Sequence, residues 1–223
     1  MLIFFITALG FRVICRCDKA FQQWLREEKK LLRKQWRGIG VLCCINSILI
    51  WFLYAEHLYE KCLYTVLSFA VPFFIIAGCL MLACVMDSMI FQVHNFVWWI
   101  AGVAGIAMLI GGRAHDSLLP LLTFCFLQQI FFAKMYGRAD CHAFCICAVM
   151  ECAYGISFEG YLIHMLIAFG FLALVQAIGR NINSSGNLKK PVAFLPYITV
   201  SFWFLLFITE AANENLVYLY KCS

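Results

Sequence analysis

The chain has 223 residues, of which 64% are hydrophobic and only 13% charged, and its formal net charge is +5. A soluble globular domain is about half apolar and about a quarter charged, so this composition excludes a water-soluble globule. Intrinsic disorder is excluded too, because 17% of the residues are aromatic. The composition predicts an all-α membrane protein that crosses the bilayer several times.

Residues 1–15 form the first apolar stretch, which shows neither a basic n-region nor a clear small-residue cleavage site, so we do not expect a cleaved signal peptide. The stretch is either a short span or a helix in the membrane interface. The segment that follows is rich in Lys and Arg and carries Phe21, Trp24 and Trp36 at helical spacing. It is typical of an amphipathic helix on an anionic membrane surface, with a solvated connector as the alternative. We take 1–38 as one N-terminal region.

Seven apolar runs follow, and polar loops separate them. They cover residues 39–55, 62–86, 97–111, 118–133, 141–158, 161–178 and 192–209. A segment inside a bilayer must satisfy its own backbone, and these runs are too long for barrel strands, so we expect helices. The sequence therefore predicts a helix bundle of about seven or eight transmembrane helices. Its membrane domain would cover 39–209, and a short polar tail would cover 210–223.

The basic residues predict the orientation, because cytoplasmic loops collect Lys and Arg. If 12–37 is cytoplasmic and each later run crosses once, fourteen basic residues lie on the cytoplasmic side and three on the other. The loops around Asp87, Lys134 and Lys189 then face the cytoplasm.

Most of the thirteen cysteines lie inside apolar runs, where a free cysteine behaves as a small hydrophobic residue. The closest approach to a metal pattern is the group Cys141, His142, Cys145 and Cys147. On a helix these side chains point around more than half of the circumference, so they do not converge as the ligands of a tetrahedral zinc ion do. We expect no metal and no other cofactor.

Two of the four aspartates, Asp87 and Asp140, lie at the ends of apolar runs with little charge around them. Both fall at the expected cytoplasmic boundary, where a carboxylate is a candidate functional group. Helix capping is the alternative. It explains Asp140 at the start of a run better than Asp87 at the end of one, where a negative charge meets the negative end of the helix dipole.

A pair of carboxyl groups supplies a specific chemistry. Two carboxyls in close contact cannot both ionise easily and share a proton near neutral pH. One can then activate water as a general base while the other protonates a carbonyl oxygen and later the leaving amine. Asp87 and Asp140 are therefore candidate catalytic residues of an aspartic hydrolase.

At these residues the sequence resembles the type IV prepilin peptidases, a family of GxGD-type membrane aspartic peptidases. MDSMIFQVHN is similar to the family's D-x-R-x-x-x-I-P-N loop, with Asp87 and Asn95 at the matching offset of eight. MYGRADCHAF is similar to the G-x-G-D-V-K segment, with Gly137 and Asp140 in register.

A third segment, KKPVAFLPYITVSFWF, is similar to the late P-F-G-P-F-L-A segment of the family, with Phe194, Pro196 and Tyr197 in register. The resemblance covers about residues 62–209, which is the peptidase core.

Four positions depart from the family pattern: Met89, His94, Ala139 and His142. Ala139 gives a G-x-A-D form, which relatives tolerate. The N-terminal cysteine module of the longer, bifunctional members is not visible, so the resemblance implies a short peptidase-only form without methyltransferase activity.

The resemblance implies an endopeptidase of the plasma or inner membrane whose active site faces the cytoplasm. Its substrate would be a prepilin-like precursor, cleaved between a short basic leader and a hydrophobic segment by water that the two aspartates activate. The expected partners are this precursor and the lipid bilayer, and no nucleic acid.

Two other hypotheses remain. GGRAHDSLLPLLTFC is faintly similar to the accessory-gene-regulator membrane peptidases, in which His115 would activate Cys125. The alternative from another class is a catalytically degenerate relative or a small proton- or cation-coupled transporter. Glu151, inside an apolar run, would best support a transporter, unless it is simply a carboxyl bonded to a neighbouring helix.

Overall fold

The structure of the protein is a computed structural model that describes residues 63–111, 118–182 and 192–221. Several expectations lie outside these residues. They are the N-terminal region 1–38, the apolar run 39–55 and the histidine of the His115–Cys125 hypothesis.

The described residues form six α-helices and no strands, which confirms the all-α prediction. The helices are α4 (Leu63–Ile90), α5 (Asn95–Gly111), α6 (Leu118–Ile130), α7 (Arg138–Ala153), α8 (Phe158–Ile182) and α9 (Leu195–Lys221), with a short 3-10 turn at Phe132–Lys134. Each helix coincides with one of the apolar runs to within a few residues. The exception is α9, which continues through most of the segment expected as a polar tail.

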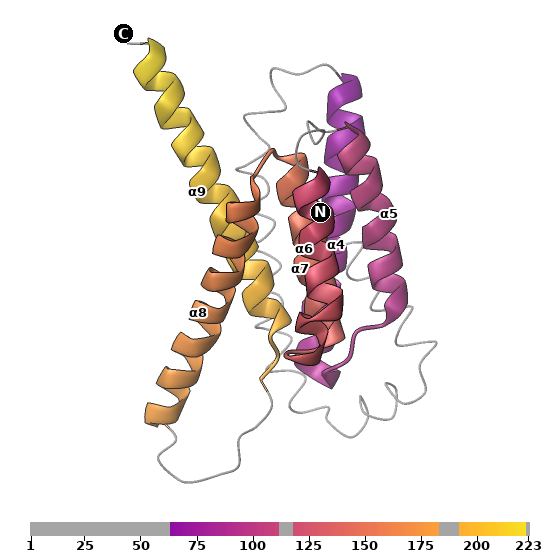
Figure 1. Ribbon diagram of the computed structural model, residues 1–223, viewed down its shortest axis with the longest axis vertical. Helices are drawn as coiled ribbons and strands as arrows, with labels where there is room; N and C mark the ends of the chain where they lie inside the picture. Colours follow the sequence, from indigo (N-terminus) through magenta and orange to yellow (C-terminus); the bar gives the residue numbers. More distant parts are fainter. Residues whose placement is uncertain (1–62, 112–117, 183–191, 222–223) are drawn as a thin grey trace.

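The helices alternate in direction along the chain (Figure 1). α4, α5, α6 and α7 are grouped together, and α8 and α9 lie beside them and cross each other. The end of α4 and the starts of α5, α7 and α9 lie at the same end of the bundle. Residues from four separate segments can therefore meet there.

α7 is the central helix, since it contacts α4, α5, α6, α8 and α9. Ten of its sixteen residues are buried, many of them alanine or cysteine. Small side chains allow neighbouring helices to approach closely. The contact with α5 also depends on Gly105, where an added Cβ would lie 2.9 Å from Cγ1 of Val149.

Two of the described helices contain segments long and apolar enough to cross a membrane, at Ala70–Met89 and Phe158–Ala177. Three shorter apolar segments lie at Asn95–Gly111, Leu118–Lys134 and Leu195–Thr209. The Phe158–Ala177 segment is only 28% buried and presents an apolar outer face. Seven or eight spans stay a prediction.

Candidate active site

Asp87 lies in the last turn of α4, three residues before the helix ends at Ile90. Its side chain is only 8% exposed. The next residue after the helix, Phe91, has a φ of 53°, a left-handed conformation that is uncommon for a bulky residue. Its backbone N–H donates to the carbonyl of Asp87 at 3.0 Å. The helix therefore ends abruptly just after the carboxyl group, and the chain turns back toward α5.

Asp140 lies in the first turn of α7, as its position at the start of an apolar run predicts. Gly137 is the residue before the helix and has a φ of 115° and a ψ of 151°. This region favours glycine, because a side chain there clashes with the backbone. A Cβ at Gly137 would also lie 3.3 Å from Oδ2 of Asp140. The glycine lets the chain turn into α7 while leaving room for the carboxylate.

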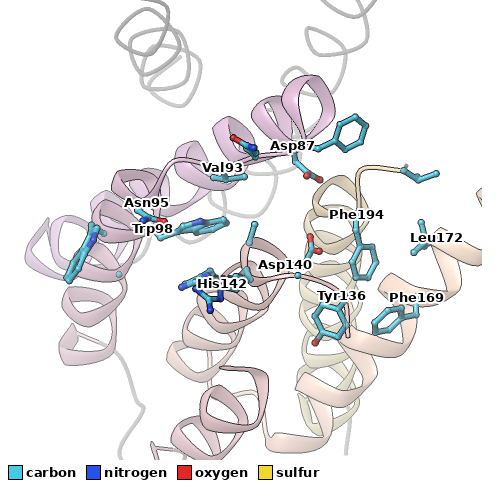
Figure 2. A pocket seen from close by; sticks show the side chains of 18 of the residues that line it. Asp87, Val93, Asn95, Trp98, Tyr136, Asp140, His142, Phe169, Leu172 and Phe194 are labelled. Atoms are coloured by element: carbon cyan, nitrogen blue, oxygen red, sulfur yellow. Dashed lines mark hydrogen bonds between the residues drawn. The ribbon is translucent and has the colours of Figure 1, made fainter. Parts of the chain in front are cut away.

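The two carboxyl groups point toward one another across a pocket of about 1160 Å³ (Figure 2). Asp87 and Asp140 are 53 positions apart in the sequence, and the packing of α4 and α7 brings them together. Burial raises the pKa of Asp140 from 3.8 to about 7, and the negative charge of Asp87 contributes to the rise. This pair can hold one proton near neutral pH, which is the arrangement that acid–base catalysis by two carboxyls requires.

α9 fixes the orientation of Asp87. The backbone N–H of Leu195, in the first turn of α9, donates to Oδ2 of Asp87 at 3.2 Å. The first N–H groups of a helix have no partner within the helix, so they are available to bind a carboxylate. The neighbouring Phe194 is buried and packs against Phe169 of α8, with ring centroids 4.9 Å apart.

Aromatic side chains form much of the pocket wall. Tyr136 lies against Phe194 on one side of the pocket. On another side, Trp98 of α5 stacks on His142 of α7 with centroids 5.7 Å apart. Figure 2 shows these groups around the two carboxyls. The hydroxyl of Tyr136 donates to the side-chain carbonyl of Gln128, and burial raises the pKa of this phenol. Tyr136 is thus a neutral wall residue.

Of the five residues expected to support the site, four line the pocket and one does not. Asn95, Gly137, Ala139 and Phe194 line the pocket with the two aspartates, and Asn95 is exposed. Pro196 lies in the first turn of α9 and does not line the pocket.

Of the departures from the family pattern, His142 lines the pocket, whereas Met89 is buried in the last turn of α4 and does not line it. The imidazole Nδ1 of His142 lies within hydrogen-bonding distance of the carbonyl of Arg138. This contact lies within the first turns of α7 itself, beside Asp140.

The cysteine and histidine group of α7 is divided between different surroundings. Cys141 and Cys147 are buried, whereas His142 faces the pocket. Within the described ranges, no three His, Cys, Asp or Glu side chains are grouped closely enough to hold a metal ion.

Comparison of the chain with protein-family models, with curated proteins and with solved structures finds no match.

Three contributions to the site were missed by sequence reasoning: Trp98, Tyr136 and the backbone N–H of Leu195. The first two are aromatic residues in an aromatic-rich chain, so no pattern separates them from aromatic neighbours on the outer surface. The Leu195 N–H had a usable signal, because the first turn of a helix always presents unpaired donors. What could not be read was which acceptor would lie in front of it.

Proposed function

We propose that this protein is a membrane aspartic endopeptidase that cleaves the leader of a prepilin-like precursor. The observation that carries the proposal is the facing pair of Asp87 and Asp140 in one pocket. The similarity of three segments to the prepilin peptidases supplies the substrate class, and the carboxyl pair supplies the chemistry. The pocket is adjacent to apolar helices, as cleavage next to a hydrophobic segment would need.

The reaction follows from a pair that holds one proton. The ionised carboxyl takes a proton from a water molecule while the oxygen of that water bonds to the scissile carbonyl carbon. The protonated carboxyl gives its proton to the carbonyl oxygen, which produces a tetrahedral diol. Return of a proton to the amide nitrogen then breaks the C–N bond and restores the carbonyl. The products are a carboxylic acid and an amine.

The lining of the pocket suits a cleavage site that is joined to an apolar helix. Its lining continues from the carboxyls along α5 to Trp99, Val103 and Ile106, all of which are strongly exposed. An apolar substrate helix could pack on this face while the leader junction reaches the carboxyls. Lipid would cover the same face when no substrate is bound.

The test is cleavage of a synthetic precursor, with a basic leader, a glycine and an apolar helix, by the purified protein in lipid vesicles. Asp87→Asn and Asp140→Asn should each abolish cleavage, because an amide can neither accept the proton of water nor donate the shared proton. Glu159→Gln is the matched control, since Glu159 is exposed in the first turn of α8 and should leave cleavage unchanged. Substantial cleavage by either Asn variant would contradict the proposal.

The proposal includes several membrane crossings, with the pocket on the cytoplasmic side. Its support is the fourteen-to-three division of basic residues and the alternating direction of the described helices. A reporter enzyme fused after Asn187 should be active in the cytoplasm, and one fused after Ser223 should be active outside. The same location for both reporters would contradict an odd number of crossings between them.

The alternative, a degenerate relative or a small proton- or cation-coupled transporter, predicts a different outcome. A protein of this kind would leave the precursor intact under all conditions. Glu151, the residue most favourable to transport, is fully buried and paired with a histidine. This pairing supports a structural role for Glu151.

A further inference from the structure

A buried polar chain connects three helices some distance from the carboxyl pocket. Glu151 of α7 and His164 of α8 are 0% and 1% exposed. Oε1 of Glu151 lies 2.7 Å from Nδ1 of His164, and Nε2 of His164 lies 2.9 Å from the carbonyl oxygen of Ile198 in α9. Phe144 and Phe202 pack against the imidazole, and Phe144 also packs against Tyr136 and Phe194 of the pocket wall.

The hydrogen-bonding roles in this chain follow from the carbonyl of Ile198. A carbonyl oxygen only accepts, so Nε2 of His164 must carry a proton and donate it. One further proton then lies between Nδ1 and the carboxyl of Glu151. It is either on the imidazole, which gives an ion pair, or on the carboxyl, which gives a neutral pair. Both arrangements have no net charge, and both hold the three helices together.

The same turn of α9 is also attached to α4. Leu195 donates to Asp87, and Thr199 Oγ1 lies 3.1 Å from Sγ of Cys84, which is one turn before Asp87. The first turns of α9 are thus held to the helix that bears Asp87 by two contacts. Through Ile198 and His164 they are held to the helix that bears Asp140.

We propose that Glu151 and His164 are positioning residues, which set the placement of α9 against α7 and thereby the alignment of Asp87 with Asp140. This inference rests on the proposed peptidase function. Glu151 is eleven residues from Asp140, which corresponds to about 16 Å along a helix, so the pair acts through helix placement and not by contact. A shift of about 1 Å between reacting groups can reduce a rate by about 100-fold.

The positioning role makes the charge of Glu151 dispensable. In Glu151→Gln the amide N–H can donate to Nδ1 of a neutral His164, while Nε2 still donates to Ile198. The geometry is kept, so this variant should cleave the synthetic precursor within about threefold of the parent protein. If the pair instead transferred a proton, the same variant would be inactive.

The matched disruptive variant replaces both partners, Glu151→Leu with His164→Leu. It removes the polar connection without leaving either group buried and unpaired, so the protein should still fold. We expect kcat for the precursor to fall by about 10- to 100-fold while KM changes by less than threefold. Ser201→Ala is the control, because the Ser201 hydroxyl donates to the same carbonyl of Ile198 from within α9, and this is a bond within one helix. This control should match the parent.

A second measurement does not need peptidase activity. The infrared C=O band of protonated Asp140, identified by its loss in Asp140→Asn, reports the surroundings of that carboxyl. The band should shift in the double leucine variant and stay in place in Glu151→Gln and Ser201→Ala. Parent-like kcat and an unshifted band in the double variant, or loss of cleavage in Glu151→Gln, would overturn the inference. A parent protein that leaves the precursor intact would overturn the proposed function, and the infrared measurement would still decide the positioning role.

Discussion

Two pairs of ionisable side chains lie in the same bundle and differ in their chemistry and in their surroundings. Asp87 and Asp140 are two acids that face each other in an open pocket. Glu151 and His164 are an acid and a base in a closed, aromatic-lined interior. Like groups in close contact cannot both be charged, whereas an acid and a base neutralise each other.

This difference suits the aspartate pair to a chemical role and the Glu151–His164 pair to a structural one. The aspartate pair lies in an open pocket that water can enter, and the burial and the like charges of its carboxyl groups cost stability. The Glu151–His164 pair is enclosed, and its contacts link α7 to α8 and, through the carbonyl of Ile198, to α9. Variants of the two pairs should therefore affect activity and stability in opposite proportions.

The largest expected effect is on cleavage by variants of the aspartate pair. In the proposed mechanism both carboxyls act on one proton, so either Asn variant removes the base and the acid together. The double variant Asp87→Asn with Asp140→Asn should be no slower than either single one, because members of one catalytic unit are strongly non-additive. Single-turnover cleavage of the precursor measures this. Losses that multiply would mean that the aspartates act independently.

The second prediction concerns stability. Glu151→Leu alone should destabilise the protein by about 3 kcal/mol, because it leaves His164 buried with one nitrogen unpaired. Asp140→Asn should leave stability unchanged or raise it, because it removes a like charge facing Asp87. Unfolding in detergent, followed by circular dichroism at pH 8, compares the two. A larger loss in Asp140→Asn would reverse the roles assigned to the pairs.

The pH dependence of cleavage should follow the proton of Asp140. With its pKa raised to about 7, cleavage should decline about tenfold per unit as the pH rises beyond that value, since the pair then loses its shared proton. The free energy of unfolding should also fall as the pH rises. Between about pH 4 and 7 the folded state keeps a proton that the unfolded state releases, so this carboxyl destabilises the fold increasingly as the pH rises. Initial rates from pH 5 to 9 test the first part, and a flat profile above pH 7 would contradict it.

The smallest of these effects is expected at Gly137. In Gly137→Ala the methyl group enforces a strained φ and crowds Oδ2 of Asp140, so stability should fall by about 1–3 kcal/mol and cleavage with it. Gly170→Ala is the matched control, because a Cβ there meets nothing within 4 Å. Rates and unfolding midpoints of the two alanine variants decide whether the conformation of Gly137 matters. Equal behaviour would remove Gly137 from the site.

Much of the fold could be predicted from the sequence, because long apolar runs between polar loops determine where the described helices lie. The two aspartates stood out for the same reason, as charges at the boundaries of such runs. The partner of Glu151 could be expected only in general terms, as some group on a neighbouring helix. That the partner is His164 depends on how α7 and α8 are rotated against each other, and no local pattern encodes that rotation.

The wall of the pocket was less predictable than its carboxyls. Trp98 and Trp99 are neighbours in the sequence, yet Trp98 is buried against His142 and Trp99 is largely exposed. α5 is apolar on all sides, so its periodicity does not distinguish a buried face from an exposed face. Only the tertiary packing makes that distinction.

The turn at Phe91 explains why the number of residues between Asp87 and Asn95 matters for the packing of α5. α4 ends at Ile90 and α5 begins at Asn95, so only four residues join two antiparallel helices at the edge of the pocket. Because the connection is so short, its length fixes the rotation of α5 relative to α4. Adding or removing one residue would rotate α5 and move Trp98 away from His142. Insertions in this hairpin should therefore be excluded by geometry, even though the connection lies at the end of the bundle where loops usually tolerate them.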